Sequence, residues 1–66
     1  MKLCELFAVM HPRMPVTVQY DGNTIHYDSV EELREDYMFY DVILWRRVVE
    51  IWHSKNLYNS MVIVLE

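Results

Sequence analysis

The side chains that could act as nucleophiles or metal ligands are few and far apart in this sequence. It holds one cysteine, Cys4, and three histidines, His11, His26 and His53. Zinc sites draw ligands from closely spaced pairs such as Cys-x-x-Cys, and no such pair occurs. Nucleophilic catalysis needs a thiol or hydroxyl beside an oriented base, and the only glycine, Gly22, cannot form a glycine-rich phosphate loop. We therefore expect no catalytic residue, no metal and no cofactor, and a protein that is not an enzyme.

Acidic residues instead cluster on and just before a predicted helix: Asp28, Glu31, Glu32, Glu35 and Asp36. Glu31/Glu35 and Glu32/Asp36 are i, i+4 pairs of like charge, each costing roughly 0.2–0.5 kcal/mol. An ordinary solvated helix face is one interpretation. The functional alternative is a negative patch that binds a basic groove of another protein, including a groove that otherwise holds nucleic acid.

Aromatic residues follow the acidic stretch directly: Tyr37, Phe39, Tyr40 and Trp45. Tyrosine and tryptophan anchor many protein interfaces because they combine a large apolar area with a polar group. Core packing is the simpler interpretation of each one singly. If Tyr40 or Trp45 points outward beside the acids, the two features together form a protein-binding site.

Length and charge narrow the class of protein. The chain has 66 residues and a net charge of −4, which suits one domain over residues 1–66 with a core that buries only about 60% of the unfolded surface. The acidic excess disfavours direct nucleic-acid binding. No segment approaches the ~20 apolar residues of a membrane span. A lone cysteine favours a reducing cytoplasm.

The elements that must position these residues begin with a hairpin. Two alternating runs, Val16–Tyr20 and Thr24–Tyr27, flank Asp21-Gly22, a dipeptide that accepts the positive φ values of a tight turn. This pairing places Val18 opposite Ile25. One side of the hairpin is then apolar and the other polar, as expected for an antiparallel sheet on a small core.

Two helices are predicted. The first covers Lys2–Met10 and ends before the prolines that follow; its apolar stripe consists of Leu3, Leu6, Phe7 and Met10. The second begins at Ser29, which caps its N-terminus while Glu32 reaches back to Ser29. It ends between Tyr37 and Asp41, with a stripe formed by Val30, Leu33, Tyr37, Tyr40 and Leu44.

A second hairpin completes the chain, with one strand at Arg46–His53, a turn at Lys55-Asn56 and a last strand that begins at Tyr58 or Ser60 and ends at Leu65. Both of its faces are partly apolar, and one would carry Trp52 beside Met61. Either the N-terminal helix or a second chain covers that face, so we expect a homodimer. The element order is α-β-β-α-β-β, an α+β domain with an antiparallel sheet of two hairpins.

A family resemblance adds to this interpretation. The elements that carry it are Met1-Lys2-Leu3 with Glu5-Leu6, Pro15-Val16-x-Val18, Asp21-Gly22 with Ile25, and Val30-Glu31-Glu32-Leu33 before a final β-hairpin. In these the chain resembles small orphan proteins carried by phages and prophages of Gram-positive bacteria. Some of those are anti-defence factors, including anti-CRISPR proteins. The resemblance implies a non-enzymatic inhibitor but carries over no active residue.

Two functions of different class follow. The first is a phage or mobile-element protein that acts in the cytoplasm of its bacterial host and inhibits a nucleic-acid-handling defence effector. It would bind that host protein through Glu31, Glu32, Glu35 and Asp36 with Tyr40, Trp45 and Trp52. The second is a small homo-oligomeric module that sequesters a small ligand such as a signalling nucleotide.

Overall fold

The first hairpin forms as predicted, in a computed structural model that describes residues 1–66 apart from the side chain of Tyr37. Strands β1 (Val16–Tyr20) and β2 (Asn23–Tyr27) pair antiparallel in the expected register. Asp21 and Gly22 form the turn with φ values of 49° and 78°, the left-handed conformation that tight hairpins require. The Asp-Gly signal therefore fixes both the turn and the pairing.

The second hairpin has a different register from the predicted one. Strands β3 (Val48–Ser54) and β4 (Ser60–Leu65) pair antiparallel, with Trp52 opposite Val62. The prediction that Trp52 shares a face with Met61 is wrong. The loop between the strands has five residues, 55–59, where two were predicted. Because the two lengths differ by an odd number, every side chain of one strand moves to the other face relative to its partner strand.

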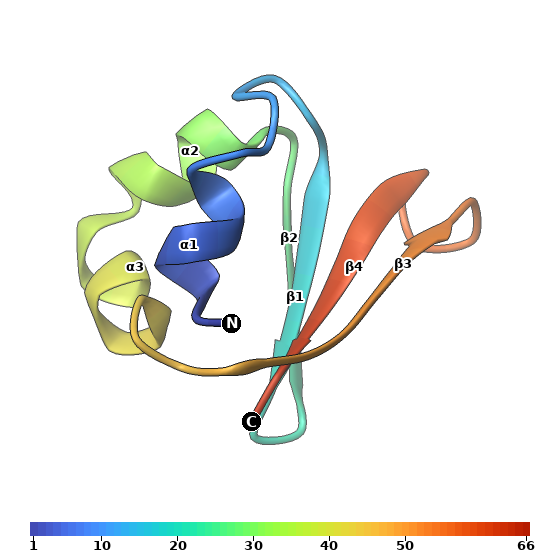
Figure 1. Cartoon of the computed structure of the whole chain (residues 1–66). Helices are drawn as coiled ribbons and strands as arrows, with labels where there is room; N and C mark the ends of the chain where they lie inside the picture. Colours follow the sequence, from blue (N-terminus) through green and yellow to red (C-terminus); the bar gives the residue numbers. More distant parts are fainter.

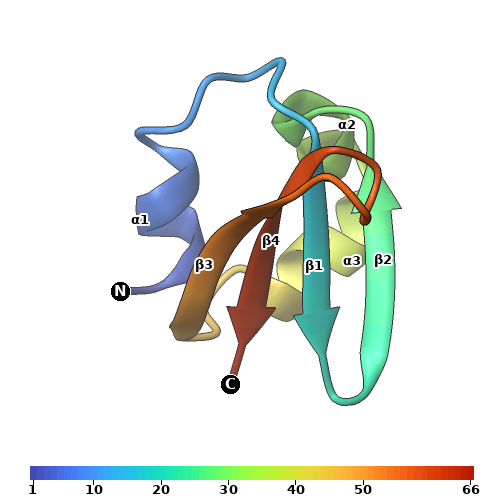
Figure 2. The ribbon, with the colours of Figure 1, turned by 90° about the vertical axis from the view of Figure 1, so that its right-hand side faces the viewer.

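The four strands form one mixed sheet in the order β2-β1-β4-β3, with the two central strands β1 and β4 parallel (Figure 2). The predicted purely antiparallel sheet is wrong in this respect. Val62 and Ile63 are fully buried although they point to opposite faces of β4. A strand that is apolar on both faces belongs at the centre of a sheet, and the more polar β2 remains at an edge.

Three helices cover one face of this sheet: α1 (Leu3–Phe7), α2 (Val30–Glu35) and α3 (Tyr37–Ile43) (Figure 1). The order is thus α-β-β-α-α-β-β, and the predicted α+β class is confirmed. Helix α1 ends before Met10, because the chain turns at exposed residues on its way to the prolines. The predicted single second helix is wrong, because the chain breaks at Asp36 and starts a new helix.

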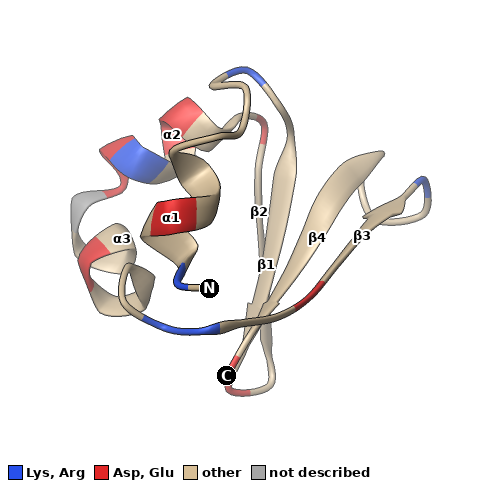
Figure 3. Cartoon of the chain, in the orientation of Figure 1, with Lys and Arg blue, Asp and Glu red and all other residues tan. Residues whose placement is uncertain are grey.

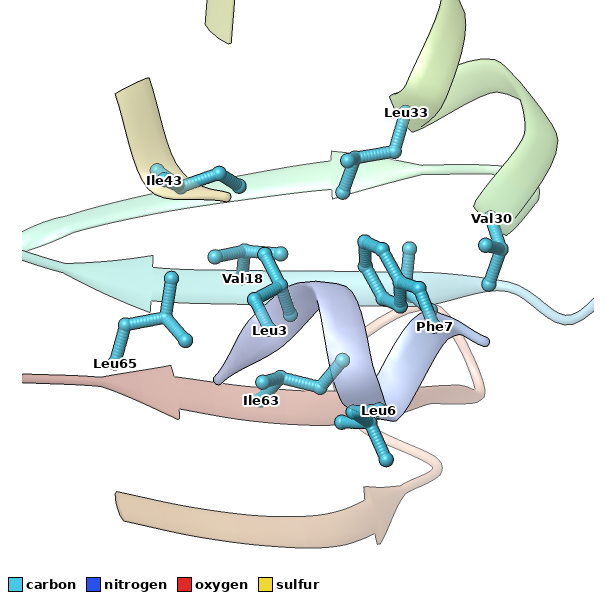
Figure 4. Packing of buried hydrophobic residues seen from close by; sticks show 10 residues of the cluster. Leu3, Leu6, Phe7, Val18, Val30, Leu33, Ile43, Ile63 and Leu65 are labelled. Carbon is cyan, nitrogen blue, oxygen red and sulfur yellow. The ribbon is translucent and has the colours of Figure 1, made fainter. Parts of the chain in front are cut away.

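The hydrophobic core lies between the helices and the sheet (Figure 4). All three helices and the two central strands supply it, through Leu3, Leu6, Phe7, Val16, Val18, Val30, Leu33, Ile43, Ile63 and Leu65. Fully burying one such side chain stabilises the fold by about 1.5–3 kcal/mol. Because α1, α2 and α3 are held by this core, their outer faces are left for other roles.

Candidate functional site

Local hydrogen bonds fix the start of α2 and leave its acids in solvent. The Ser29 hydroxyl accepts from Glu32 N–H at 3.1 Å, as predicted. The Glu32 carboxylate accepts from Asp28 N–H at 3.2 Å, one residue earlier than predicted. Glu31 N–H donates to the carbonyl of Pro12 at 3.0 Å, so the preceding loop satisfies another free amide of the first turn. Three acidic side chains of this helix are exposed: Glu31, Glu32 and Glu35.

Asp36 is the hinge between α2 and α3. Its φ and ψ of −78° and 79° are not helical, yet its N–H still donates to Glu32 and Leu33 carbonyls, and its own carbonyl accepts from Tyr40 N–H at 2.9 Å. The Asp36 carboxylate accepts a short hydrogen bond from the Tyr27 hydroxyl. Burial, and then this bond, raise the pKa of Tyr27. Asp36 therefore orients α3 and is only partly free for a partner.

The inner face of α3 packs into the protein. The Phe39 ring lies 5.4 Å from that of Tyr20 and 5.8 Å from that of Tyr27, centroid to centroid. The ring of Tyr40 stacks on Phe7 with centroids 6.2 Å apart. Tyr40, which the sequence nominated as an interface anchor, is half-buried and belongs mainly to this packing.

The outer face of α3 and the turn after it carry exposed apolar side chains. Met38, Val42 and Trp45 are 82%, 60% and 65% exposed; Met38 and Val42 lie on one side of the helix at i, i+4 spacing, and Trp45 lies in the turn that follows. Asp41 is exposed on the same helix. We name the α2–α3 surface as the exposed set Glu31, Glu32, Glu35, Met38, Asp41, Val42 and Trp45.

Charge is strongly one-sided over these helices (Figure 3). Residues 28–45 hold six acids and one base, Arg34. The guanidinium of Arg34 donates to the carbonyl of Phe7 at 2.6 Å, which ties α2 to α1. The acidic excess of the whole chain thus lies in one segment, beside the exposed apolar side chains.

The structure leaves most of the residues nominated from the sequence exposed, but on separate elements. The three exposed glutamates and Trp45 lie on α2 and at the end of α3, with the Lys2 ammonium 5.2 Å from the Trp45 ring centroid. Trp52 lies on edge strand β3, away from these helices. Met38, Asp41 and Val42 were missed. Residues 37–45 are almost continuously apolar, so the sequence alone does not show which of them face outward. Helix periodicity divides them into an inner and an outer set only when the residue at which α3 begins is known.

A network resembling a catalytic triad lies on the helix-free face of the sheet. The Thr17 hydroxyl is 2.6 Å from that of Ser60 and 3.2 Å from His26 Nδ1, while His26 Nε2 is 3.2 Å from an Asp28 carboxylate oxygen. Ser60 donates its proton to the carbonyl of Leu57 at 2.5 Å. Thr17 must therefore donate to Ser60, and its oxygen can accept from His26 only in the form of the ring that carries a proton on Nδ1. In a neutral ring that form leaves no proton on Nε2 for Asp28.

This network is structural. Thr17 and Ser60 are fully buried, and Tyr58 stacks on the His26 ring with centroids 4.1 Å apart. A nucleophile needs access to its substrate, and neither hydroxyl has it. The 55–59 loop crosses β1 to reach β2 (Figure 2). This loop covers the end of this face where Tyr58 stacks on His26, and α1 does not cover this face because it lies with the other helices on the opposite face (Figure 1).

Other site types find little support. The described residues contain no group of three or more His, Cys, Asp or Glu placed to hold a metal. A shallow concavity lies beside the first turn, lined in part by Tyr20, Asp21 and Val64. Its lining has an acid and no base, so it offers a phosphate nothing to pair with. None of the helices that the structure describes is long and apolar enough to cross a membrane.

The α2–α3 surface thus combines the chain's acidic segment with exposed apolar side chains. Comparison with known proteins adds no family to this picture: no protein-family model, curated protein or solved structure matches the chain.

Proposed function

We propose that this chain is a non-enzymatic interaction protein that inhibits a host defence effector by binding a basic, nucleic-acid-handling surface of that effector. The observation that carries the proposal is the coincidence, on the α2–α3 surface, of exposed acids with the exposed apolar side chains of Met38, Val42 and Trp45. A basic protein groove with apolar patches is the chemistry that complements it.

The two halves of the surface have different physical roles. The acids attract a basic partner over about 8 Å at physiological salt, so they act mainly on the association rate. The apolar side chains act only on contact: burying a methionine or tryptophan side chain contributes about 1.5–3 kcal/mol, and its loss speeds dissociation. An occupied groove is closed to nucleic acid, which is the proposed inhibition.

The test separates these roles with two variants that leave internal bonds intact. Glu31→Lys/Glu35→Lys reverses two exposed acids and spares Glu32, which caps α2. Met38→Ser/Val42→Ser removes apolar area without changing charge. Glu66→Lys is the control remote from the surface: it changes the net charge as much as one of the two glutamate reversals does and loses only the exposed ion pair with Arg47.

Affinity capture from host lysate with the wild type identifies the partner, and nucleic-acid binding by that purified partner is then measured with each variant. We expect the wild type and Glu66→Lys to block nucleic-acid binding. The glutamate reversal should slow association and flatten its salt dependence, and the serine variant should raise the dissociation rate. Equal inhibition by all variants would remove the α2–α3 surface from the mechanism.

A further inference from the structure

The outer edge of β3 has backbone groups with no partner in the described structure. Met61 N–H donates to the carbonyl of Pro15 at 3.0 Å, so Met61 directs its backbone toward β1. Its alternate neighbours Ser60, Val62 and Val64 then face β3, and their partners there are Ser54, Trp52 and Glu50. Because backbone groups alternate in direction along a strand, Ile51 and His53 direct their N–H and C=O groups outward.

The chain covers only the beginning of this edge. Val48 N–H donates to the carbonyl of Met1 at 2.7 Å, and Leu3 N–H donates to that of Arg46 at 3.0 Å, around a bridge between Lys2 and Arg47. Beyond Val48 no backbone hydrogen bond of the described residues reaches the outer side, and the 55–59 loop turns away toward β2 (Figure 2). The open edge is therefore Glu50–Ser54.

This open edge lacks the usual protection of edge strands. Proteins protect such edges with lysines, prolines or covering loops. Here Val49, Ile51 and Trp52 are all exposed, and β3 contains no lysine or proline. The opposite edge strand, β2, exposes no large hydrophobic side chain. The difference singles out β3 as the edge built for contact.

We propose that β3 pairs antiparallel with β3 of a second copy of this chain, about a two-fold axis at Trp52. Ile51 of each copy then exchanges backbone hydrogen bonds with His53 of the other, which uses all four outward groups on each side. The result is a continuous sheet of eight strands, four from each copy. The two Trp52 side chains lie opposite each other in a non-hydrogen-bonded pair, where side chains approach closely.

The charges at the two ends of the open edge favour a second copy of this chain as the partner, and they favour this register. Glu50 lies at one end of the open edge and Lys55 just beyond the other. Neither belongs to the ion pairs among the described residues, which join His26 to Asp28, Arg46 to Asp21 and Arg47 to Glu66. In the antiparallel dimer Glu50 of one copy faces Ser54 of the other, and Lys55 is the next residue along the chain. The acid of one copy therefore lies at the same end of the pairing as the base of the other, at both ends.

The mass in solution tests the dimer, and a disulfide tests its register. Light scattering should give about twice the chain mass of 8.1 kDa for the wild type, whereas Ile51→Lys should give a monomer. Val9→Lys, at an exposed position remote from the edge, is the matched control and should remain dimeric. In a Cys4→Ala background, Trp52→Cys should form a disulfide-linked dimer, because facing Cα atoms of such a pair are ~4.5 Å apart. Ile51→Cys should not.

A charge exchange adds an independent check. Glu50→Lys and Lys55→Glu should each weaken dimerisation about tenfold, because each change places like charges at both ends of the pairing, and the double exchange should restore it. Circular dichroism of each variant confirms that the monomer stays folded. A monomeric wild type at the highest soluble concentration would overturn the proposal, as would cross-linking by Ile51→Cys in place of Trp52→Cys.

Discussion

Replacing Thr17 by valine keeps the shape of a fully buried side chain and removes one hydroxyl from the network on the helix-free face. In the wild type the hydroxyl protons run in one direction: Thr17 donates to Ser60, and Ser60 donates to the carbonyl of Leu57, while His26 Nδ1 contacts the Thr17 oxygen. After the change Ser60 keeps its acceptor but loses its donor. The imidazole of His26 loses its partner at Nδ1.

The expected cost follows from these two groups. A buried polar group left without its partner costs about 1–3 kcal/mol. The His26 side chain is 17% exposed, so water compensates part of its loss, and we expect Thr17→Val to cost about 2 kcal/mol in all. A domain of this length has a free energy of unfolding of roughly 3–10 kcal/mol. The melting temperature should therefore fall by about 10 °C.

Urea unfolding and calorimetry of four variants measure this cost. Thr24→Val, an exposed threonine on the same face, is the control and should change little. Thr17→Val/Ser60→Ala should cost less than the sum of the two single changes, because removing both partners leaves fewer unmatched groups. A Thr17→Val variant as stable as the wild type would refute the reasoning, since apolar packing alone would then hold this face.

Three further predictions concern single interactions. Burial and the bond to Asp36 raise the pKa of Tyr27 above its ordinary value of 10.0. The contribution of this neutral hydroxyl to stability is complete below pH 10.0 and is lost as the pH rises past that value. Urea titrations of Tyr27→Phe should therefore show a smaller loss of stability at alkaline pH than those of the wild type. Arg46, mainly through its hydrogen bond, lowers the pKa of Asp21 below 3.8. That contribution is present at neutral pH and lost as the pH falls below 3.8, and Asp21→Asn should make acid unfolding less steep in this range. Gly22→Ala should cost about 1 kcal/mol in thermal unfolding, since φ is 78° while the space for a Cβ is free; an unchanged melting temperature would contradict this.

Local signals in the sequence determined the parts of the fold that were predicted correctly. The Asp21-Gly22 turn sets its own register, and Ser29 caps its own helix, because both act within a few residues. The break at Asp36 has no such local signal. It lets Phe39 reach Tyr20 and Tyr27, contacts between segments that are far apart in the sequence.

The second hairpin was mispredicted for a related reason. Lys55-Asn56 looks like a two-residue turn, but the loop is closed by Ser54 accepting from Leu57 N–H and Ser60 donating to the Leu57 carbonyl. Tyr58 adopts a φ of 59°, which a bulky residue rarely does, and stacks on His26. A tertiary contact thus selects the loop, and the loop sets which face Trp52 occupies.

The two proposed surfaces are compatible in one assembly. A two-fold axis at Trp52 runs perpendicular to the paired strands and to the sheet, so both copies place their helices on the same face of the continuous sheet. The α2–α3 surfaces of the dimer then face the same side, and neither is used in pairing, since β3 is an edge strand. A dimer with two acidic surfaces on one side can engage two basic sites of an assembled effector at once. The second contact is then intramolecular, which strengthens binding without any new interaction type. Self-association through β3 would in this way serve inhibition through α2 and α3.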